Sequence, residues 1–598
     1  MIPKRRMHYR IAVIFVSVWL TLGAHAADMS KILRLGFPTA ETGFDPIAVS
    51  DLYSNTIIEA IIEPMLAYDY LARPVKLMPL TLAEMPQISD NGSTYTFKLK
   101  PGILFADDPA FNGKRRELVA ADYAYSIRRL FDPALRSPWL FLLDGKIVGM
   151  DDVAAKAKTA NKFDYDAPVA GLEVVDRYTL RIHLKEPDYN LLYILAMPTL
   201  GALAREVVER YGSDLAGHPV GTGPYLLKNW IRGHKMVLDA SPSFRATYFG
   251  STPSNDPLDR QIAARLAGKK LPIIGRVEVT VIEEAQPFWL AFLGGQLDLS
   301  GIPVEFVNQV IPGGKLSPSL VKKGIRHYQS AEPDLTYTFF NMDDPTVGGY
   351  SKEKIALRRA ISTAYNTPQE IQVIRKNQAV QAQSPVAPGV AGYDPRFRTD
   401  LNEYNPAKAR ALLDHFGYQD RDGDGYRELP DGKPLQIEQA SVVGGDNRQF
   451  DELWRRNMEA IGIRMTFKKG KWPDLVKASK LGKLQMWGAA WIADYPDGEN
   501  YLQLLYGKNE DANNARFKLA AYDRLYERVK RMPDSPERTK LYQEMAKLVL
   551  VYAPWKLGVH RVANSVAQPW VSSLKRHPIM HAPWKYLDID LAKRHTRQ

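Results

Sequence analysis

Apolar positions along this chain recur with two different periods, which predicts a mixture of strands and helices. An apolar residue at about every second position predicts strands at Ile32–Phe37, Thr94–Lys100 and Tyr337–Asn341. Apolar residues at helical spacing predict helices at Asp51–Leu66, Val119–Phe131, Lys354–Tyr365 and Pro406–Phe416. The two kinds of element alternate along the chain without an internal repeat, and this order indicates an α/β fold with mixed sheets.

The N-terminus has the pattern of an export signal. Met1–Arg10 is basic and lacks acidic residues, Ile11–Gly23 is an uncharged apolar run of 13 residues, and Ala24-His25-Ala26 supplies the small residues that a signal peptidase reads. A helix of 13 residues spans about 20 Å, less than the ~30 Å hydrocarbon core of a bilayer. We therefore predict a cleaved signal peptide at residues 1–27. Because no cysteine follows the run, we expect a soluble periplasmic protein and no lipoprotein anchor.

Composition and charge exclude several classes of function. The formal charge of +12 falls to about +8 once the four basic residues of the signal are removed, and no block of like charges suggests nucleic-acid binding. The chain has no cysteine, so disulfides and thiolate nucleophiles are impossible. It also lacks G-x-S-x-G, H-E-x-x-H and Walker motifs. We therefore expect a binding protein without a cofactor or a metal, and not an enzyme.

Several short segments follow one another in an order that is typical of one protein family. They are Asp90–Phe105, Ala121–Leu130, Val220–Tyr225, Gly295–Asp298, Asn341 with the helix that ends at Tyr365, and Tyr404–Leu413. Together they resemble the family-5 extracellular solute-binding proteins, which include the oligopeptide- and dipeptide-binding proteins of bacterial ABC importers. The basic stretch Ala106–Leu118 is longer than the short turn that the family usually has there.

The resemblance implies a two-lobe periplasmic-binding-protein clamp with a hinge and an extra domain inserted in the first lobe. Lobe I would comprise residues 28–65, 205–330 and 560–598, domain II residues 66–204, and lobe III residues 331–559. The resemblance also implies a monomer that binds a peptide or peptide-like solute and delivers it to an inner-membrane ABC permease and its ATPase.

The segment from Trp487 to Asp497 carries the sharpest local signal. Peptide-binding members of the family have a similar Trp-x-Ala-Asp-Tyr segment, and the resemblance makes Asp494 the candidate anchor for a ligand α-ammonium. It assigns backbone contacts to Gly488, Ala490 and Ile492. The neighbouring aromatic residues Trp487, Trp491 and Tyr495 complete the candidate site.

The same residues also fit a purely structural interpretation, in which a core strand carries two packed tryptophans and a helix-capping aspartate. Weaker ligand-binding candidates are Thr42 and Phe44 in the turn before the first helix, and Asn341 at the end of a strand. Each of these three also fits an ordinary turn or strand end.

Other interpretations of function remain open at this point. The same fold could carry a metal chelate, haem or an opine-like conjugate, and a secreted hydrolase could use a carboxylate pair such as Asp494 and Asp497. Asp420–Asp431 has the spacing of a calcium loop, with Asp in place of Glu at its twelfth position, but we expect a solvated turn there.

Overall fold

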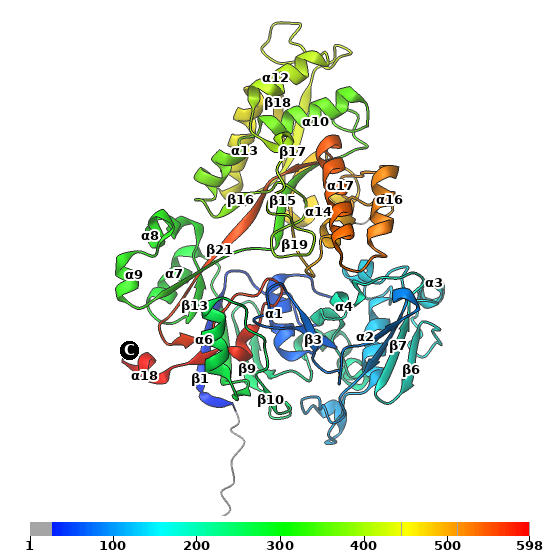
Figure 1. Cartoon of the computed structure of the whole chain (residues 1–598), viewed down its shortest axis with the longest axis vertical. Coiled ribbons are helices and arrows are strands. Elements are labelled where there is room, and N and C mark those ends of the chain that lie inside the picture. The colour runs from blue at the N-terminus through cyan, green and yellow to red at the C-terminus, as the bar shows by residue number, and fades with distance from the viewer. Residues whose placement is uncertain (1–26, 444, 511, 597–598) are drawn as a thin grey trace, which may run out of the picture.

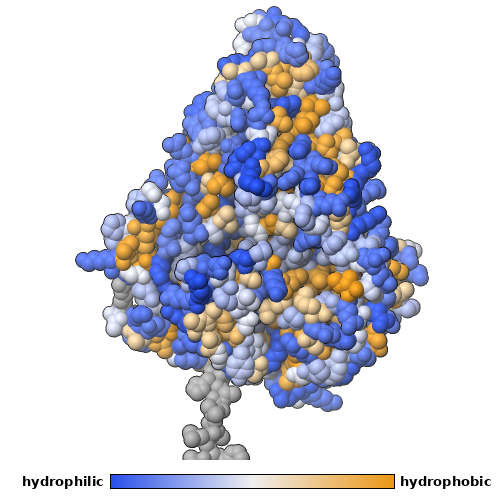
Figure 2. All heavy atoms as spheres, viewed as in Figure 1, coloured by the Kyte–Doolittle hydropathy of each residue, from blue (hydrophilic) through white to orange (hydrophobic). Residues whose placement is uncertain are grey.

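The computed structural model describes residues 27–443, 445–510 and 512–596. They form three parts, with lobe III at the top of Figure 1, lobe I below it on the left and domain II below it on the right. All of the predicted signal peptide except residue 27 lies outside the described residues. No helix in the described ranges is both long and apolar enough to cross a bilayer. On the face shown in Figure 2, hydrophobic residues form separate patches among hydrophilic ones.

Lobe I is built on a four-stranded sheet in the order β1-β12-β9-β8. The strands are β1 (Asp28–Phe37), β12 (Ile274–Val281), β9 (Lys235–Ala240) and β8 (Tyr225–Ile231), and only β1 and β12 run parallel. Helix α1 (Leu52–Ile61) begins where the carboxylate of Asp51 accepts a hydrogen bond from the backbone N–H of Ser54. The helix ends before the predicted Leu66, because Pro64 disfavours helical backbone at the residue before it.

Domain II contains an antiparallel sheet in the order β4-β5-β7-β6. Its strands are β4 (Gln87–Ser89), β5 (Thr94–Lys98), β7 (Thr179–His183) and β6 (Leu172–Asp176), and the helices α2 (Ala120–Leu130), α3 (Met150–Ala160) and α4 (Leu191–Ile194) belong to this domain. Within the basic stretch Ala106–Leu118, Phe111 is buried and Arg116 pairs with Asp122 at 2.6 Å. Both sides of this stretch are therefore anchored on domain II, while residues 112–115 between them are exposed.

Lobe III contains a five-stranded mixed sheet in the order β18-β17-β19-β15-β20. The strands are β18 (Arg464–Gly470), β17 (Gln436–Val442), β19 (Met486–Ile492), β15 (Asp334–Phe340) and β20 (Trp555–Leu557). Helices of this lobe include α10 (Lys352–Ala364), α12 (Pro406–His415), α13 (Gly445–Glu459), α16 (Ala520–Val529) and α17 (Pro536–Tyr552).

Two chain segments join lobe III to lobe I. Strand β14 (Arg326–Ala331) leads directly into β15, and β20 leads into the long strand β21 (Val559–Ala567), which descends from lobe III to lobe I in Figure 1. β21 pairs with β14, with β13 (Leu299–Gly301) and with β16 (Ala379–Gln381). A double connection of this kind suits hinged closure of two lobes on a ligand.

The structure confirms the predicted fold class, a mixed α/β clamp with two lobes and an added domain. The predicted elements are found within a few residues of their expected ends. The sheet of domain II lies inside the predicted range 66–204, and the sheet of lobe III lies inside 331–559. The domain boundaries themselves stay a prediction.

Candidate ligand-binding site

Strand β19 has a free edge where it leaves the centre of its sheet. Strand β15 pairs with it over its whole length, whereas β17 reaches only Met486 and Trp487. Among the described residues, Gly488–Ile492 therefore has no strand on its second side. Gly488, Ala490 and Ile492 are exposed, and 40 % of the Ile492 surface is accessible.

The hydrogen bonds at the two ends of the pairing show which backbone groups face this edge. The N–H of Ala493 donates to the carbonyl of Pro333 at 2.8 Å, and the N–H of Asn341 donates to the carbonyl of Gln485 at 2.9 Å. In an antiparallel pair, alternate residues face the partner strand. The backbone groups of Gly488, Ala490 and Ile492 therefore point away from β15 and toward the free edge.

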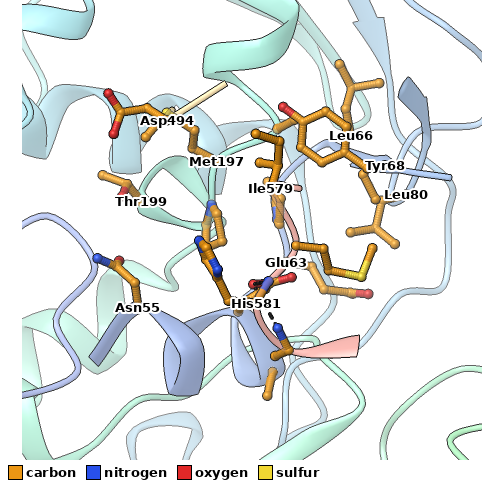
Figure 3. Close-up of a pocket in the computed structure, with 18 of the residues that line it drawn as sticks. Asn55, Glu63, Leu66, Tyr68, Leu80, Met197, Thr199, Asp494, Ile579 and His581 are labelled. Carbon is orange, nitrogen blue, oxygen red and sulfur yellow. Dashed lines mark hydrogen bonds between the residues drawn. The ribbon is translucent and has the colours of Figure 1, made fainter. Parts of the chain in front are cut away.

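Asp494 follows the strand and lines a cavity of about 230 Å³ between lobe III, lobe I and domain II. Its carboxylate accepts a hydrogen bond from the side-chain amide of Asn500 at 3.0 Å and forms no ion pair with any described residue. Burial raises the pKa of Asp494 to about 6, although the hydrogen bond from Asn500 acts in the opposite direction. Within the described residues the group is a desolvated carboxylate without a counter-charge, and it lines the cavity on the side away from Tyr68 (Figure 3).

Asn500 orients this carboxylate, and sequence reasoning did not identify it. Its side-chain oxygen accepts from the backbone N–H of Asp494 at 3.1 Å and from the indole N–H of Trp491 at 2.9 Å. Asn500 is fully buried, so its three hydrogen bonds hold Asp494 and Trp491 in fixed positions. Nothing in the local pattern of the sequence marks an asparagine six residues after the candidate anchor.

The remaining walls of the cavity come from segments far apart in sequence, which is why the sequence did not reveal them. Lobe I and the start of domain II contribute Asn55, Glu59, Glu63, Leu66, Tyr68 and Leu80, a second segment contributes Met197 and Thr199, and the C-terminal region contributes Ile579, Met580, His581 and Lys585. Figure 3 shows Leu66, Leu80, Met197, Ile579 and Tyr68 around one opening, with Asp494 at its far side from Tyr68.

Two glutamates on this wall differ in how they are neutralised. Glu63 forms an ion pair with Arg245 at 2.6 Å. Glu59 has no ion-pair partner in the part of the chain that the structure describes, and it accepts hydrogen bonds from the backbone N–H groups of His581 and Ala582, at 2.9 and 3.2 Å. Burial raises the pKa of Glu59 to about 7, despite those hydrogen bonds and the charge of Lys585. The cavity thus holds a second carboxylate that lacks a bound cation.

The structure places the other candidate residues of this segment next to the site. Trp487 is buried and packs against Trp472, with ring centroids 5.0 Å apart. Tyr495 is buried and donates from its hydroxyl to Glu499 at 2.5 Å. Trp491 is half-buried. Trp487 and Tyr495 therefore support the strand and the loop after it, and neither lines the cavity.

Three weaker candidates lie away from the cavity. Phe44 is fully buried and packs against Trp230, with ring centroids 4.8 Å apart. Thr42 donates to the carboxylate of Asp51 at 2.6 Å. Asn341 is buried and donates from its amide to the carbonyl of Gly482 at 2.9 Å. None of the three side chains lines the cavity, and their contacts fit the structural interpretation of a turn and a strand end.

The carboxylate pair of the hydrolase interpretation is not brought together in the cavity. Asp497 is fully buried, pairs with Arg538 at 2.6 Å and accepts from the hydroxyl of Tyr542 at 2.7 Å. It is not among the residues that line the cavity with Asp494. The carboxylate of Asp497 is bound to Arg538 and Tyr542 and is therefore not positioned to contact a substrate beside Asp494.

The calcium-like segment forms a hydrogen-bonded turn on the surface of lobe III. Oxygens of Asp420, Asp422, Asp424 and Glu428 lie within 4.8 Å of one another. Asp424 is already paired with Arg464 at 2.7 Å, and the carboxylate at the twelfth position, Asp431, pairs with Lys433 at 2.8 Å. These contacts favour the expected solvated turn.

A clamp with two connecting segments, a free strand edge and a cavity between its lobes defines the class of periplasmic solute-binding proteins. Residues 76–513 match the model of the bacterial extracellular solute-binding proteins, family 5, and the chain belongs to this family. Family membership agrees with the resemblance seen in the sequence and assigns the chain to proteins that bind solutes.

Relatives and solved structures extend over nearly the whole chain. The chain is 25% identical to "Di/tripeptide-binding protein 2" of Pseudomonas aeruginosa, over 98% of this chain and 100% of that one. It is 24% identical to "Heme-binding protein A" of Haemophilus influenzae, over 85% of this chain and 84% of that one. The periplasmic binding protein DppA from Helicobacter pylori, solved in complex with a peptide, superposes with a TM-score of 0.71 at 21% identity, covering 93% of this chain and 98% of that one.

Proposed function

We propose that this protein captures peptides in the periplasm and delivers them to an inner-membrane ABC permease and its ATPase. The observation that carries the proposal is the position of Asp494, an uncompensated carboxylate directly after a strand with a free edge. Relatives named for di- and tripeptides and for oligopeptides support the same ligand class.

The carboxylate of Asp494 and the free edge of β19 suit the α-ammonium and the main chain of a peptide, the two parts that do not depend on its sequence. A desolvated ammonium is costly unless it is paired, and Asp494 offers that pair at the cavity. Gly488, Ala490 and Ile492 offer backbone donors and acceptors to an extended main chain, as in the addition of a strand to a sheet edge. The glycine and the alanine leave room for close approach of the ligand backbone.

Closure of the two lobes would complete the binding cycle. The open clamp exposes the cavity, and a ligand that contacts both lobes stabilises the closed form by its differential affinity for that form. We propose that the closed form is recognised by the permease, and that no covalent chemistry takes place on this chain.

Substitution of Asp494 tests the proposal. In Asp494→Asn, the Kd for Ala-Ala-Ala should rise by roughly 150-fold, which corresponds to about 3 kcal/mol for the loss of one partner of a buried charge pair. Acetylation of the peptide N-terminus should weaken binding to the wild-type protein by a similar factor. Titration calorimetry measures both changes, and the exposed, distant Glu305→Gln is the matched control.

Equal affinity for free and acetylated tripeptides would exclude the proposed ammonium anchor. Mass spectrometry of ligand that co-purifies with the protein distinguishes the alternatives, because recovery of peptides supports the proposal. Recovery of haem, a metal chelate or an opine-like conjugate would assign the cavity to a different cargo, and turnover of peptides would favour a hydrolase.

A further inference from the structure

The cavity beyond Asp494 has a polar end that the ammonium anchor does not use. In a peptide held through its ammonium at Asp494, with its main chain on the edge of β19, the first α-carbon has one non-hydrogen substituent left, which is the first side chain. Ile492, Ala493 and Asp494 all line the cavity, so this side chain has the cavity directly in front of it. The chemistry of the cavity should therefore determine which first residues bind.

The walls next to this entrance are apolar. Leu66, Leu80, Met197, Ile579 and Met580 line the cavity, and Figure 3 shows the first four side chains grouped around the opening. Such walls suit a long aliphatic stem, and methionine side chains adapt to stems of different shape. A short polar side chain would leave them in contact with water.

Tyr68 supplies a hydroxyl that lacks a partner. The residue is only 6 % exposed and lines the cavity, and its hydroxyl oxygen has no hydrogen-bond partner in the described structure. Figure 3 shows the hydroxyl end of its ring directed toward the side where Asp494 lies. Buried polar groups are nearly always hydrogen-bonded, so a hydroxyl left free at a cavity marks a position for a polar group of the ligand.

The charges around Tyr68 indicate the sign of that ligand group. Burial is the main cause of the raised pKa of Tyr68, and the carboxylates of Glu59 and Asp494 raise it further. Both carboxylates line the same cavity as the hydroxyl, and neither forms an ion pair among the described residues. Glu63 is neutralised by Arg245, and the ammonium of Lys585, which also lines the cavity, lowers the pKa of Glu59 by less than burial raises it. A cation is favoured at this position and an anion is disfavoured.

We propose that the cavity binds a basic first side chain, with Glu59 and Tyr68 as the residues that determine this preference. This inference rests on the proposed function and names its substrate class, namely peptides that begin with arginine or lysine. The aliphatic stem of such a side chain lies along the apolar walls. Its cationic head is bound by the carboxylate of Glu59 and the hydroxyl of Tyr68, while Asp494 binds the α-ammonium.

The test compares Arg-Ala-Ala with citrulline-Ala-Ala, since citrulline has the shape of arginine without its charge. Calorimetry on the full mature chain should show binding of the arginine peptide at least tenfold tighter than that of the citrulline peptide. In Glu59→Gln this ratio should fall below threefold, while the citrulline peptide keeps its Kd within threefold. Glutamine retains an acceptor for the N–H groups of His581 and Ala582, so the local fold is preserved.

Tyr68→Phe provides a second variant, in which the arginine peptide should bind at least threefold more weakly and the citrulline peptide should lose less affinity. Glu305→Gln, which lies outside the cavity, should keep the wild-type ratio. A ratio near one in the wild-type protein overturns the inference without any variant, and so does a ratio that Glu59→Gln leaves unchanged.

The outcomes separate this inference from the proposed function. If both tripeptides bind in an Asp494-dependent manner but with equal affinity, the peptide function holds and the preference for a basic residue fails. If neither tripeptide binds, or if N-acetylation has no effect, both fail.

Discussion

The pKa of Asp494 determines how peptide affinity should depend on pH. Burial holds the pKa of this carboxyl at about 6 in the ligand-free protein. An ammonium at hydrogen-bonding distance favours the ionised carboxylate and lowers the pKa in the complex. Binding therefore releases a proton wherever the free carboxyl is protonated, and affinity should decrease as the pH falls through 6.

The magnitude follows from the fraction of ligand-free protein that is already ionised. With a pKa of about 6, Asp494 is roughly 90% ionised at pH 7 and roughly 9% ionised at pH 5. The Kd of Ala-Ala-Ala should thus rise about tenfold between pH 7 and pH 5, which is about 1.4 kcal/mol. At pH 6 about half a proton should be released for each peptide bound.

Titration calorimetry at pH 5, 6 and 7, in buffers with different ionisation enthalpies, measures the affinity and the proton release together. The small first side chain of Ala-Ala-Ala keeps Glu59 out of the contact, and the same series in Glu59→Gln removes any residual contribution from that group. Asp494→Asn should bind weakly at every pH and show no slope between pH 5 and 7. A flat profile in the wild-type protein, or an equal slope in Asp494→Asn, would refute the assignment of the anchor.

Two further predictions concern stability. Burial raises the pKa of Asp494 to about 6, so its charge opposes folding at pH 7. Asp494→Asn should therefore raise the free energy of unfolding of the ligand-free protein by about 2 kcal/mol. Urea denaturation should show this gain shrinking from pH 6 to pH 4, and a loss of stability at pH 7 would contradict the prediction. Arg538→Leu leaves Asp497 buried without its cation and should cost about 3–5 kcal/mol. The exposed pair of Arg528 and Glu537 gives the control Arg528→Leu, which should change stability by less than about 1 kcal/mol; equal losses in the two arginine variants would show that Asp497 does not need its partner.

The fold was largely predictable because its elements depend on local pattern. The strand at Thr94–Lys98 and the helix at Ala120–Leu130 follow directly from alternating and helical spacing of apolar residues. Order within the sheets was not predictable in the same way. Strand β19 lies between β17 and β15, and its pairing with β17 ends after two residues, a property of long-range packing that leaves no local signal.

The candidate site was predictable only where it coincides with a contiguous segment. Asp494 and its strand could be predicted because the contiguous segment Trp491–Tyr495 resembles a Trp-x-Ala-Asp-Tyr pattern of the family. Glu59 and Tyr68 could not, since one lies in an ordinary helix and the other in a short strand, and they line a cavity with Asp494 only in the folded chain. Phe44 illustrates the opposite difficulty, because the sequence does not show that an aromatic residue in a turn is buried against Trp230.

Asp494 and Asp497 show why a binding function can be argued from this structure. Only Tyr495 and Pro496 separate them, and both are aspartates with the same intrinsic chemistry. Asp497 is fully buried with Arg538, Tyr542 and a backbone N–H as partners, so its charge is satisfied within the protein. Asp494 has one neutral amide as its partner and faces a cavity that also holds an unpaired Glu59. A fold that neutralises one carboxylate so completely can neutralise its neighbour, and the missing counter-charge at Asp494 is therefore best explained by a cation that arrives with the ligand.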